Sequence, residues 1–320
     1  MKRDGTVRAY LELFRLPNVF TAIADVALGF LLTHVSVVAG PTSQLVTFTL
    51  LVMASCFLYT AGMVLNDAFD AEIDAAERPH RPIPSGRVSP IAARWLGRQM
   101  LLVGVALGWL AGWSSGSWCC GVVATLLAGC VYAYDARLKA TCWGPLAMGG
   151  CRMLNVLLGA SAAVLPWHAL HWAVAGGLGI YIAGVTWFAR TEARLSSRSH
   201  LAGATGVMLV GLGVIASYPT LIGSDVGPSD VAGLYAATYF EPLRWFGLWG
   251  ILAAVLAGRC ALAIARPTPH FVQMAVKSCI QSLVIVDAAA VYALRGPWAA
   301  VGILVLLIPT LYLGRWIYST

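Results

Sequence analysis

Residues 66–74 hold the densest group of side chains that could do chemistry, namely Asn66, Asp67, Asp70 and Asp74. The acids recur at steps of three and four, the spacing that places side chains on one face of a helix. Crowded carboxylates repel one another unless a cation lies among them, and such hard oxygen ligands suit Mg²⁺. We therefore predict a metal site formed by these four residues. The alternative is a solvated acidic helix start that is stabilised by the helix dipole.

Cationic and polar side chains that could bind phosphate follow in three segments. They are Arg78, Arg81, Tyr134, Arg137, Lys139, Arg152 and Asn155. Arg78 and Arg81 lie in a loop rich in proline and glycine, where guanidinium groups could hold phosphate oxygens in bidentate fashion. Arg137 and Lys139 stand just after an apolar run, and we assign them with the three aspartates to the catalytic group.

Two polar residues within apolar runs allow two interpretations each. Arg152, with Asn155 one turn later, either faces a partner or a wet cavity, or extends to the membrane surface. Asn18 either completes the ligand shell of a metal ion or caps a helix. We include all three residues among the candidate substrate-binding residues.

These residues must be positioned by a membrane protein, because the chain of 320 residues is 59% hydrophobic and only 11% charged. A soluble domain carries roughly twice that charge. Lipid leaves no partner for free backbone groups, so each span must be helical. We predict one all-α transmembrane bundle over residues 1–320, with ten spans, or nine because several are short. The predicted spans are roughly 17–38, 44–65, 96–113, 117–134, 144–165, 168–189, 202–222, 244–264, 277–294 and 297–317.

The distribution of basic residues predicts the orientation in the membrane. Most lysines and arginines precede the first span or lie near residues 78–98, 137–139, 190–198 and 259–277, whereas the opposite connections hold only Arg244 and Arg295. This asymmetry predicts that both termini and the charged loops are cytoplasmic, and that the 223–243 loop is not. The net charge of +7 thus reflects topology and not binding of nucleic acid. We expect no cleavable signal peptide, and we interpret the eight cysteines as small apolar filler.

Carboxylates for Mg²⁺, cations for phosphate and apolar helices around a cavity suit one class of substrate, an isoprenoid diphosphate. Its head is a polyanion and its tail is apolar. Mg²⁺ and basic residues would stabilise the departing pyrophosphate, and a dry cavity would protect the allylic cation until a lipophilic acceptor captures it.

The motif at 66–74, continued by Arg78-Pro-x-Arg81-Pro-x-Pro-x-Gly86, resembles the signature of the UbiA superfamily of intramembrane prenyltransferases. Further segments resemble the same family, namely Arg15-Leu-Pro-Asn18-x-x-Thr21, Tyr134-x-x-Arg137-Leu-Lys139 and Gly150-x-Arg152. The resemblance implies an all-helical fold around a central cavity. It also implies two facing aspartate motifs and Mg²⁺-dependent prenyl transfer to an aromatic or other lipophilic acceptor.

The chain departs from this family where the second aspartate motif is expected. Residues 187–194 contain one acid, Glu192, between Arg190 and Arg194. We expect these arginines to contact the pyrophosphate in place of a second metal ion, with Glu192 either orienting them or supplying one ligand to Mg²⁺. The alternative is ordinary anchoring of a cytoplasmic loop. This Thr-Glu-Ala-Arg pattern resembles the UbiA-like branch called EboC. The altered motif also leaves a second function open, a non-catalytic protein that binds or translocates lipid.

Overall fold

The computed structural model describes residues 2–37, 41–163, 167–222 and 239–315, and every regular element in these ranges is helical. Most of the 223–243 loop, whose location we predicted, lies outside the described residues. The helices are α1 (Lys2–Leu13), α2 (Leu16–Thr33), α3 (Thr42–Phe69), α4 (Ala71–Glu77), α5 (Pro90–Ser115), α6 (Cys119–Ala136), α7 (Gly144–Ala160), α8 (Ala169–Ala189), α9 (Arg198–Ser217), α10 (Pro242–Ala265), α11 (Pro269–Leu304) and α12 (Leu307–Leu313), with short 3₁₀ turns η1 (Leu138–Ala140) and η2 (Tyr218–Leu221).

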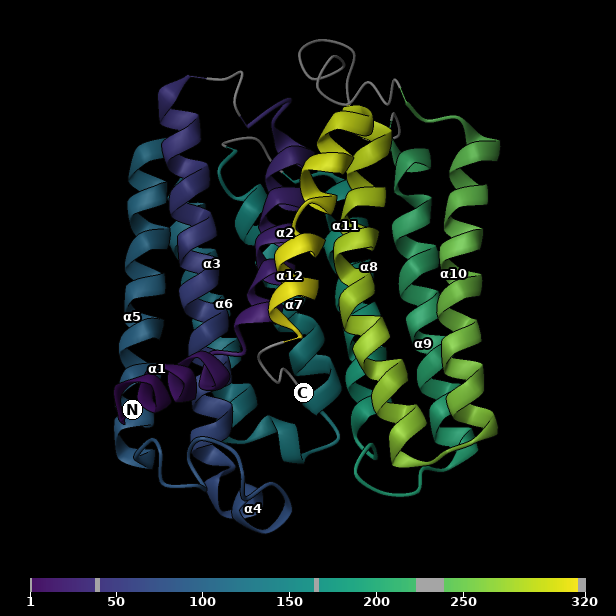
Figure 1. Cartoon of the computed structure of the whole chain (residues 1–320). Helices are drawn as coiled ribbons and strands as arrows, with labels where there is room; N and C mark the ends of the chain where they lie inside the picture. The colour runs from purple at the N-terminus through teal and green to yellow at the C-terminus, as the bar shows by residue number, and fades with distance from the viewer. Residues whose placement is uncertain (1, 38–40, 164–166, 223–238, 316–320) are drawn as a thin grey trace.

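The long helices run side by side as one bundle (Figure 1). Within the described residues, seven segments are long and apolar enough to cross a membrane: α2, α3, α6, α8, α9 with η2, α10, and α11 with α12. Helix α5 packs mainly on α3 at the edge of the bundle, and α7 packs on α2 and α8 (Figure 1). The fold is therefore a polytopic membrane bundle, as the composition predicted.

The last two predicted spans correspond to two helical segments of α11 and α12 that run in opposite directions and are joined at Gly296. At Gly296 the backbone has φ 76° and ψ −171°, and Pro297 follows. Glycine adopts this left-handed conformation without the steric cost that a Cβ would bring. The chain then returns along the bundle through the end of α11 and α12, which packs against α2 (Figure 1).

Helices α2 and α7 approach each other closely because glycine occupies both faces of the contact. A Cβ on Gly29 would collide with the carbonyl oxygen of Val156, and a Cβ on Gly159 with that of Val26. Small residues allow such close backbone packing in membrane helices, where van der Waals contact drives association. This contact fixes α7, which carries Arg152, against α2.

Helix α1 lies across one end of the bundle, the same end as α4 and the α8–α9 connection (Figure 1). Ala9 and Leu13 of α1 are fully buried there against a small apolar cluster that includes Ala68 and Ile83. Glu12 binds Arg87 at 2.8 Å, which ties α1 to the loop after α4. The charged loops that contain the candidate site residues thus gather at one end.

Candidate functional site

The three aspartates of the first motif do not lie on one continuous helix. Asp67 is in the last turn of α3, Asp70 ends that helix with φ −89° and ψ 7°, and Asp74 lies in α4. The prediction that the three carboxylates share one helix face is therefore wrong, because the backbone bends at Asp70 and turns its side chain toward a different partner.

Arginines bind the two aspartates that the bend leaves close together. Asp67 and Asp74 are 4% and 3% exposed, so neither is well solvated. Arg81 contacts both, at 3.4 Å to Asp67 Oδ1 and 2.6 Å to Asp74 Oδ2. Arg15 adds a second contact to Asp67 Oδ1 at 2.8 Å. Buried carboxylates need such compensation, since an unpaired buried charge is strongly destabilising.

Asp70 pairs with a cation from the opposite side of the site. Lys139 Nζ, in the η1 turn after α6, lies 2.6 Å from Asp70 Oδ1 and 3.5 Å from the backbone oxygen of Asn66. Thus Arg15, Arg81 and Lys139 reach the three carboxylates from three separate segments. In the described part of the chain, no three His, Cys, Asp or Glu side chains converge on a point where they could hold a metal ion.

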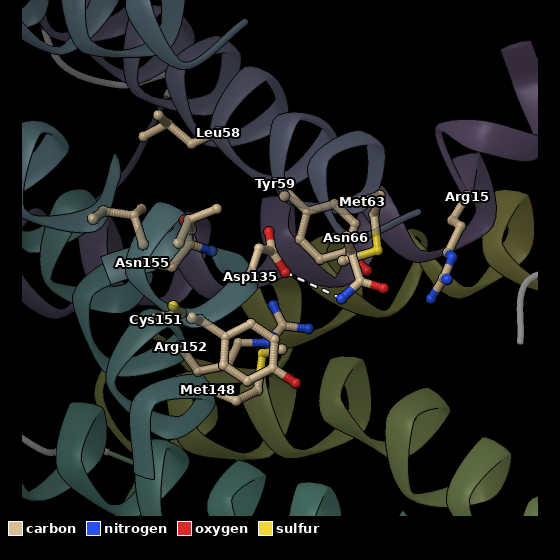
Figure 2. A pocket seen from close by; sticks show the side chains of 14 residues that line it. Arg15, Leu58, Tyr59, Met63, Asn66, Asp135, Met148, Cys151, Arg152 and Asn155 are labelled. Atoms are coloured by element: carbon tan, nitrogen blue, oxygen red, sulfur yellow. Dashed lines mark hydrogen bonds between the residues drawn. The ribbon is translucent and has the colours of Figure 1, made fainter. Parts of the chain in front are cut away.

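A cavity of about 190 Å³ opens beside this network of ion pairs. Figure 2 shows its lining, which comes mostly from α3, α6 and α7, with Arg15 at one side. Apolar side chains dominate the walls, among them Leu58, Met63 and Met148. Tyr134, Asn66, Arg152 and Asn155, all predicted as site residues, line the same cavity.

Asp135 is a cavity residue that our sequence analysis missed. It is 3% exposed, and one carboxylate oxygen accepts a 3.1 Å hydrogen bond from Asn66 Nδ2 (Figure 2). Its other oxygen is buried without a hydrogen-bond partner among the described residues. An acid directly beside Tyr134 at the end of an apolar run was the signal that could have identified it.

Arg152 and Asn155 meet α2 at the deep side of the cavity. Arg152 donates to Asp25 and to the hydroxyl of Thr21, and Asn155 Nδ2 donates to Asp25 at 2.9 Å. Arg152 is 8% exposed, so it does not extend to the membrane surface. Near the start of α2, the Asn18 side chain bonds to the Tyr59 hydroxyl, and its backbone oxygen accepts from Thr21.

Comparison with known proteins decides the family. Residues 26–270 match the model of the UbiA prenyltransferase family, which is more than half of the chain. The chain belongs to the UbiA prenyltransferase family. The finer resemblance to the EboC branch stays a prediction.

Relatives and solved structures agree with this UbiA assignment. The chain is 33% identical to the digeranylgeranylglyceryl phosphate synthase of Methanopyrus kandleri over 50% of this chain and 57% of that protein. It is 37% identical to the synthase of Ignicoccus hospitalis over 44% and 42%. The chain thus spans about half the length of these curated relatives. A structure of a digeranylgeranylglyceryl phosphate synthase is similar in fold, with a TM-score of 0.61 and 19% identity over 91% of this chain and 99% of that one. A UbiA homologue from Archaeoglobus fulgidus bound to DMAPP and Mg²⁺ has a TM-score of 0.57 and 13% identity over 87% and 99%.

Glu192, in the segment where the resemblance places a second aspartate motif, contacts the loop that follows the first motif. Arg78 Nη2 lies 3.4 Å from Glu192 Oε1, so the loop after α4 touches the α8–α9 connection. Burial raises the pKa of the Glu192 carboxyl, and the Arg78 guanidinium opposes that rise. Both side chains are about a quarter exposed, so this pair contributes less than the buried pairs of Arg81.

The arginines on either side of Glu192 lie elsewhere. Arg190 donates to the backbone carbonyls of Thr141 and Lys139 and so holds the turn that carries Lys139. Arg194 is exposed, as is Arg137. In this arrangement Arg190 supports Lys139 indirectly, whereas the cations beside the first motif are Arg15, Arg81 and Lys139.

Proposed function

We propose that this UbiA-family protein transfers an isoprenoid group from an allylic diphosphate to a lipophilic acceptor. One observation carries the proposal: a cluster of cations and carboxylates stands beside a cavity with mainly apolar walls. The cluster matches a diphosphate, and the cavity matches an isoprenoid chain. The family to which the chain belongs supports the same chemistry.

In this proposal the cations of the cluster bind the diphosphate oxygens. The planar guanidinium groups of Arg15 and Arg81 suit bidentate contacts to phosphate. Lys139 supplies a compact charge from the opposite side. Held together, these charges stabilise the diphosphate as the bond to the allylic carbon breaks. The apolar walls exclude water, so that the acceptor and not water captures the allylic carbon.

The donor atoms of the first motif fit Mg²⁺ by their chemistry. Asp67, Asp70 and Asp74 offer carboxylate oxygens, and the Asn66 amide offers an oxygen because its nitrogen donates to Asp135. Hard oxygen ligands of this kind are those that Mg²⁺ prefers. To hold the ion, the three aspartates and Asn66 would have to leave their present partners and converge, because their carboxylates do not meet at one point in this arrangement. When bound, Mg²⁺ supplies neutralising charge to the leaving diphosphate.

The acceptor class is open to two candidates. The two relatives from Methanopyrus and Ignicoccus are named for a product in which prenyl groups are joined to glyceryl phosphate. A lipid alcohol is therefore an acceptor candidate beside the aromatic ring that the superfamily resemblance implies. We further propose that the end of the bundle with the charged loops faces the cytoplasm, following the distribution of basic residues.

One finding favours the non-catalytic alternative. Each aspartate of the first motif already has a cation partner, and the second motif retains only Glu192. A site whose aspartates are already paired with cations could bind a lipid diphosphate without cleaving it.

The test uses the purified protein in detergent or nanodiscs with labelled dimethylallyl, geranyl and geranylgeranyl diphosphates and Mg²⁺. Parallel reactions contain a glyceryl phosphate lipid, a hydroxylated aromatic acid or no acceptor. Prenylated product that requires both Mg²⁺ and an acceptor supports transfer and identifies the acceptor class. Saturable binding of the diphosphate without release of pyrophosphate under any condition would support the non-catalytic protein instead.

A further inference from the structure

A second group of buried charged residues lies outside the diphosphate site. Asp25 in α2 and Asp287 in α11 are both 0% exposed, and their carboxyl groups lie within hydrogen-bonding reach of each other. Arg152 of α7 binds Asp25 on its other side. The cluster thus joins three helices in the interior of the bundle, where ionisable residues are costly and have a functional role by default.

The hydrogen bonds of this cluster leave part of it unsatisfied. Arg152 and Asn155 both donate to Asp25 Oδ2. Asp25 Oδ1 and both oxygens of Asp287 are buried and have no hydrogen-bond partner among the described residues. An ionised carboxylate only accepts hydrogen bonds, so two ionised carboxylates cannot bond to each other. A buried polar group without a partner is strongly disfavoured.

The net charge of the cluster is a second reason to expect a bound proton there. Among the described residues, the other side chains with contacts to this cluster are neutral at ordinary pH: Thr21 from α2, Ser55 and Tyr59 from α3, and Asn155 from α7. Two ionised aspartates beside one arginine would leave a net negative charge in the interior of a membrane protein. One proton removes that charge, and it also supplies the missing donor between the two carboxyl groups.

We propose that Asp25 and Asp287 form a proton-binding site, in which one proton is shared and Asp287 is the neutral partner. Asp25 remains ionised because two donors, one of them the Arg152 cation, already stabilise its charge. The hydroxyl of the protonated Asp287 donates to Asp25 Oδ1. The cluster is then electrically neutral, and the Arg152 charge is balanced within the protein.

This balance has a consequence for the cavity, because Arg152 lines it. A guanidinium already bound to Asp25 offers little net charge to a diphosphate. The pair of Arg152 with Asp25 therefore leaves no uncompensated charge on the Arg152 side of the cavity.

Infrared spectroscopy of the purified protein without substrate tests the proton directly, whether or not the protein is an enzyme. At neutral pH the C=O stretch of a protonated carboxyl is distinct from the bands of ionised carboxylates. We expect this band in the wild type and its loss in Asp287→Asn. The control is Glu241→Gln, which removes an exposed carboxyl paired with Arg244 and should leave the band unchanged.

Two further variants keep the proposal testable if Asp287→Asn folds poorly. Asp25→Asn should also abolish the band, because Asp287 would then ionise to balance Arg152. The double variant Asp25→Asn/Asp287→Asn should melt below either single variant, since it leaves Arg152 without a counter-charge. If Asp287→Asn removed only ionised carboxylate intensity, or melted well above the wild type, both aspartates would be ionised and the proposal would be overturned.

Discussion

The replacement Arg81→Ala tests the network of ion pairs most sharply, because Arg81 compensates two buried carboxylates at once. Its side chain is 9% exposed, and it lies 2.6 Å from Asp74 and 3.4 Å from Asp67. Asp67 keeps its contact with Arg15 in the variant, but Asp74 loses the cation beside it. Removing one partner of a buried ion pair costs about 3–5 kcal/mol, since the remaining charge stays buried and unpaired.

Arg87 provides a matched control in the same loop. It pairs with Glu12 at 2.8 Å, but its side chain is 34% exposed. Exposed pairs contribute about 0–1 kcal/mol because solvent screens them. Thermal or chemical unfolding in one detergent should therefore rank the variants, with Arg81→Ala well below Arg87→Ala and Arg87→Ala close to the wild type.

Added Mg²⁺ separates a metal site from a purely structural network. If the aspartates are metal ligands, Arg81 competes with the ion for the same oxygens, and its removal frees them. Mg²⁺ should then raise the melting temperature of Arg81→Ala more than that of the wild type, since a ligand that binds only the folded state stabilises it. Equal losses in Arg81→Ala and Arg87→Ala would refute the reasoning about burial. An equal response of Arg81→Ala and wild type to Mg²⁺ would refute the assignment of the aspartates as ligands.

Three other predictions concern catalysis, packing and orientation. Asp70→Ala should abolish Mg²⁺-dependent turnover while the melting temperature falls little, because this carboxylate is about a quarter exposed; full activity in the variant would exclude Asp70 from the site. Gly159→Val should prevent folding, seen as loss of the monodisperse peak in size-exclusion chromatography, because the new side chain meets the Val26 carbonyl, whereas Gly206→Val has open space and should fold; similar yields would contradict the close contact of α2 and α7. A membrane-impermeant maleimide should label the exposed Cys142 only in inside-out vesicles, and labelling only from the opposite face would reverse the orientation.

Hydropathy predicted the bundle well because each span must bury its backbone and present apolar side chains to lipid. It placed span ends less well. The apolar run ends at Leu65, but α3 continues to Phe69 and carries Asn66 and Asp67 with it. Backbone hydrogen bonds continue the helix where the hydropathy has already changed. Conversely, α7 ends at Ala160, earlier than the run to residue 165 suggested.

Residue type and spacing selected candidate residues, because metal and phosphate binding need carboxylates and cations. The structure brings Arg81 and Lys139 to the aspartates. It places three other predicted cations, Arg137, Arg190 and Arg194, elsewhere. Which cation meets which acid depends on contacts between distant segments, such as Arg15 with Asp67 across 52 positions. A local sequence pattern does not reveal which residues pair across such a separation in the sequence. For the same reason the sequence could not show that Arg190 turns toward the carbonyl of Thr141.

Arg15 lines the cavity and has an unusual backbone conformation. Among the described residues it alone combines a side chain with a positive φ, at 44°. This left-handed backbone costs an ordinary residue roughly 1–2 kcal/mol, and glycine would adopt it freely. The sharp turn between α1 and α2 therefore needs no arginine, and a glycine would make it more cheaply. The Arg15 guanidinium nevertheless lies 2.8 Å from Asp67 Oδ1. What this residue contributes is therefore a positive charge beside Asp67, at a cost in backbone free energy that glycine would avoid.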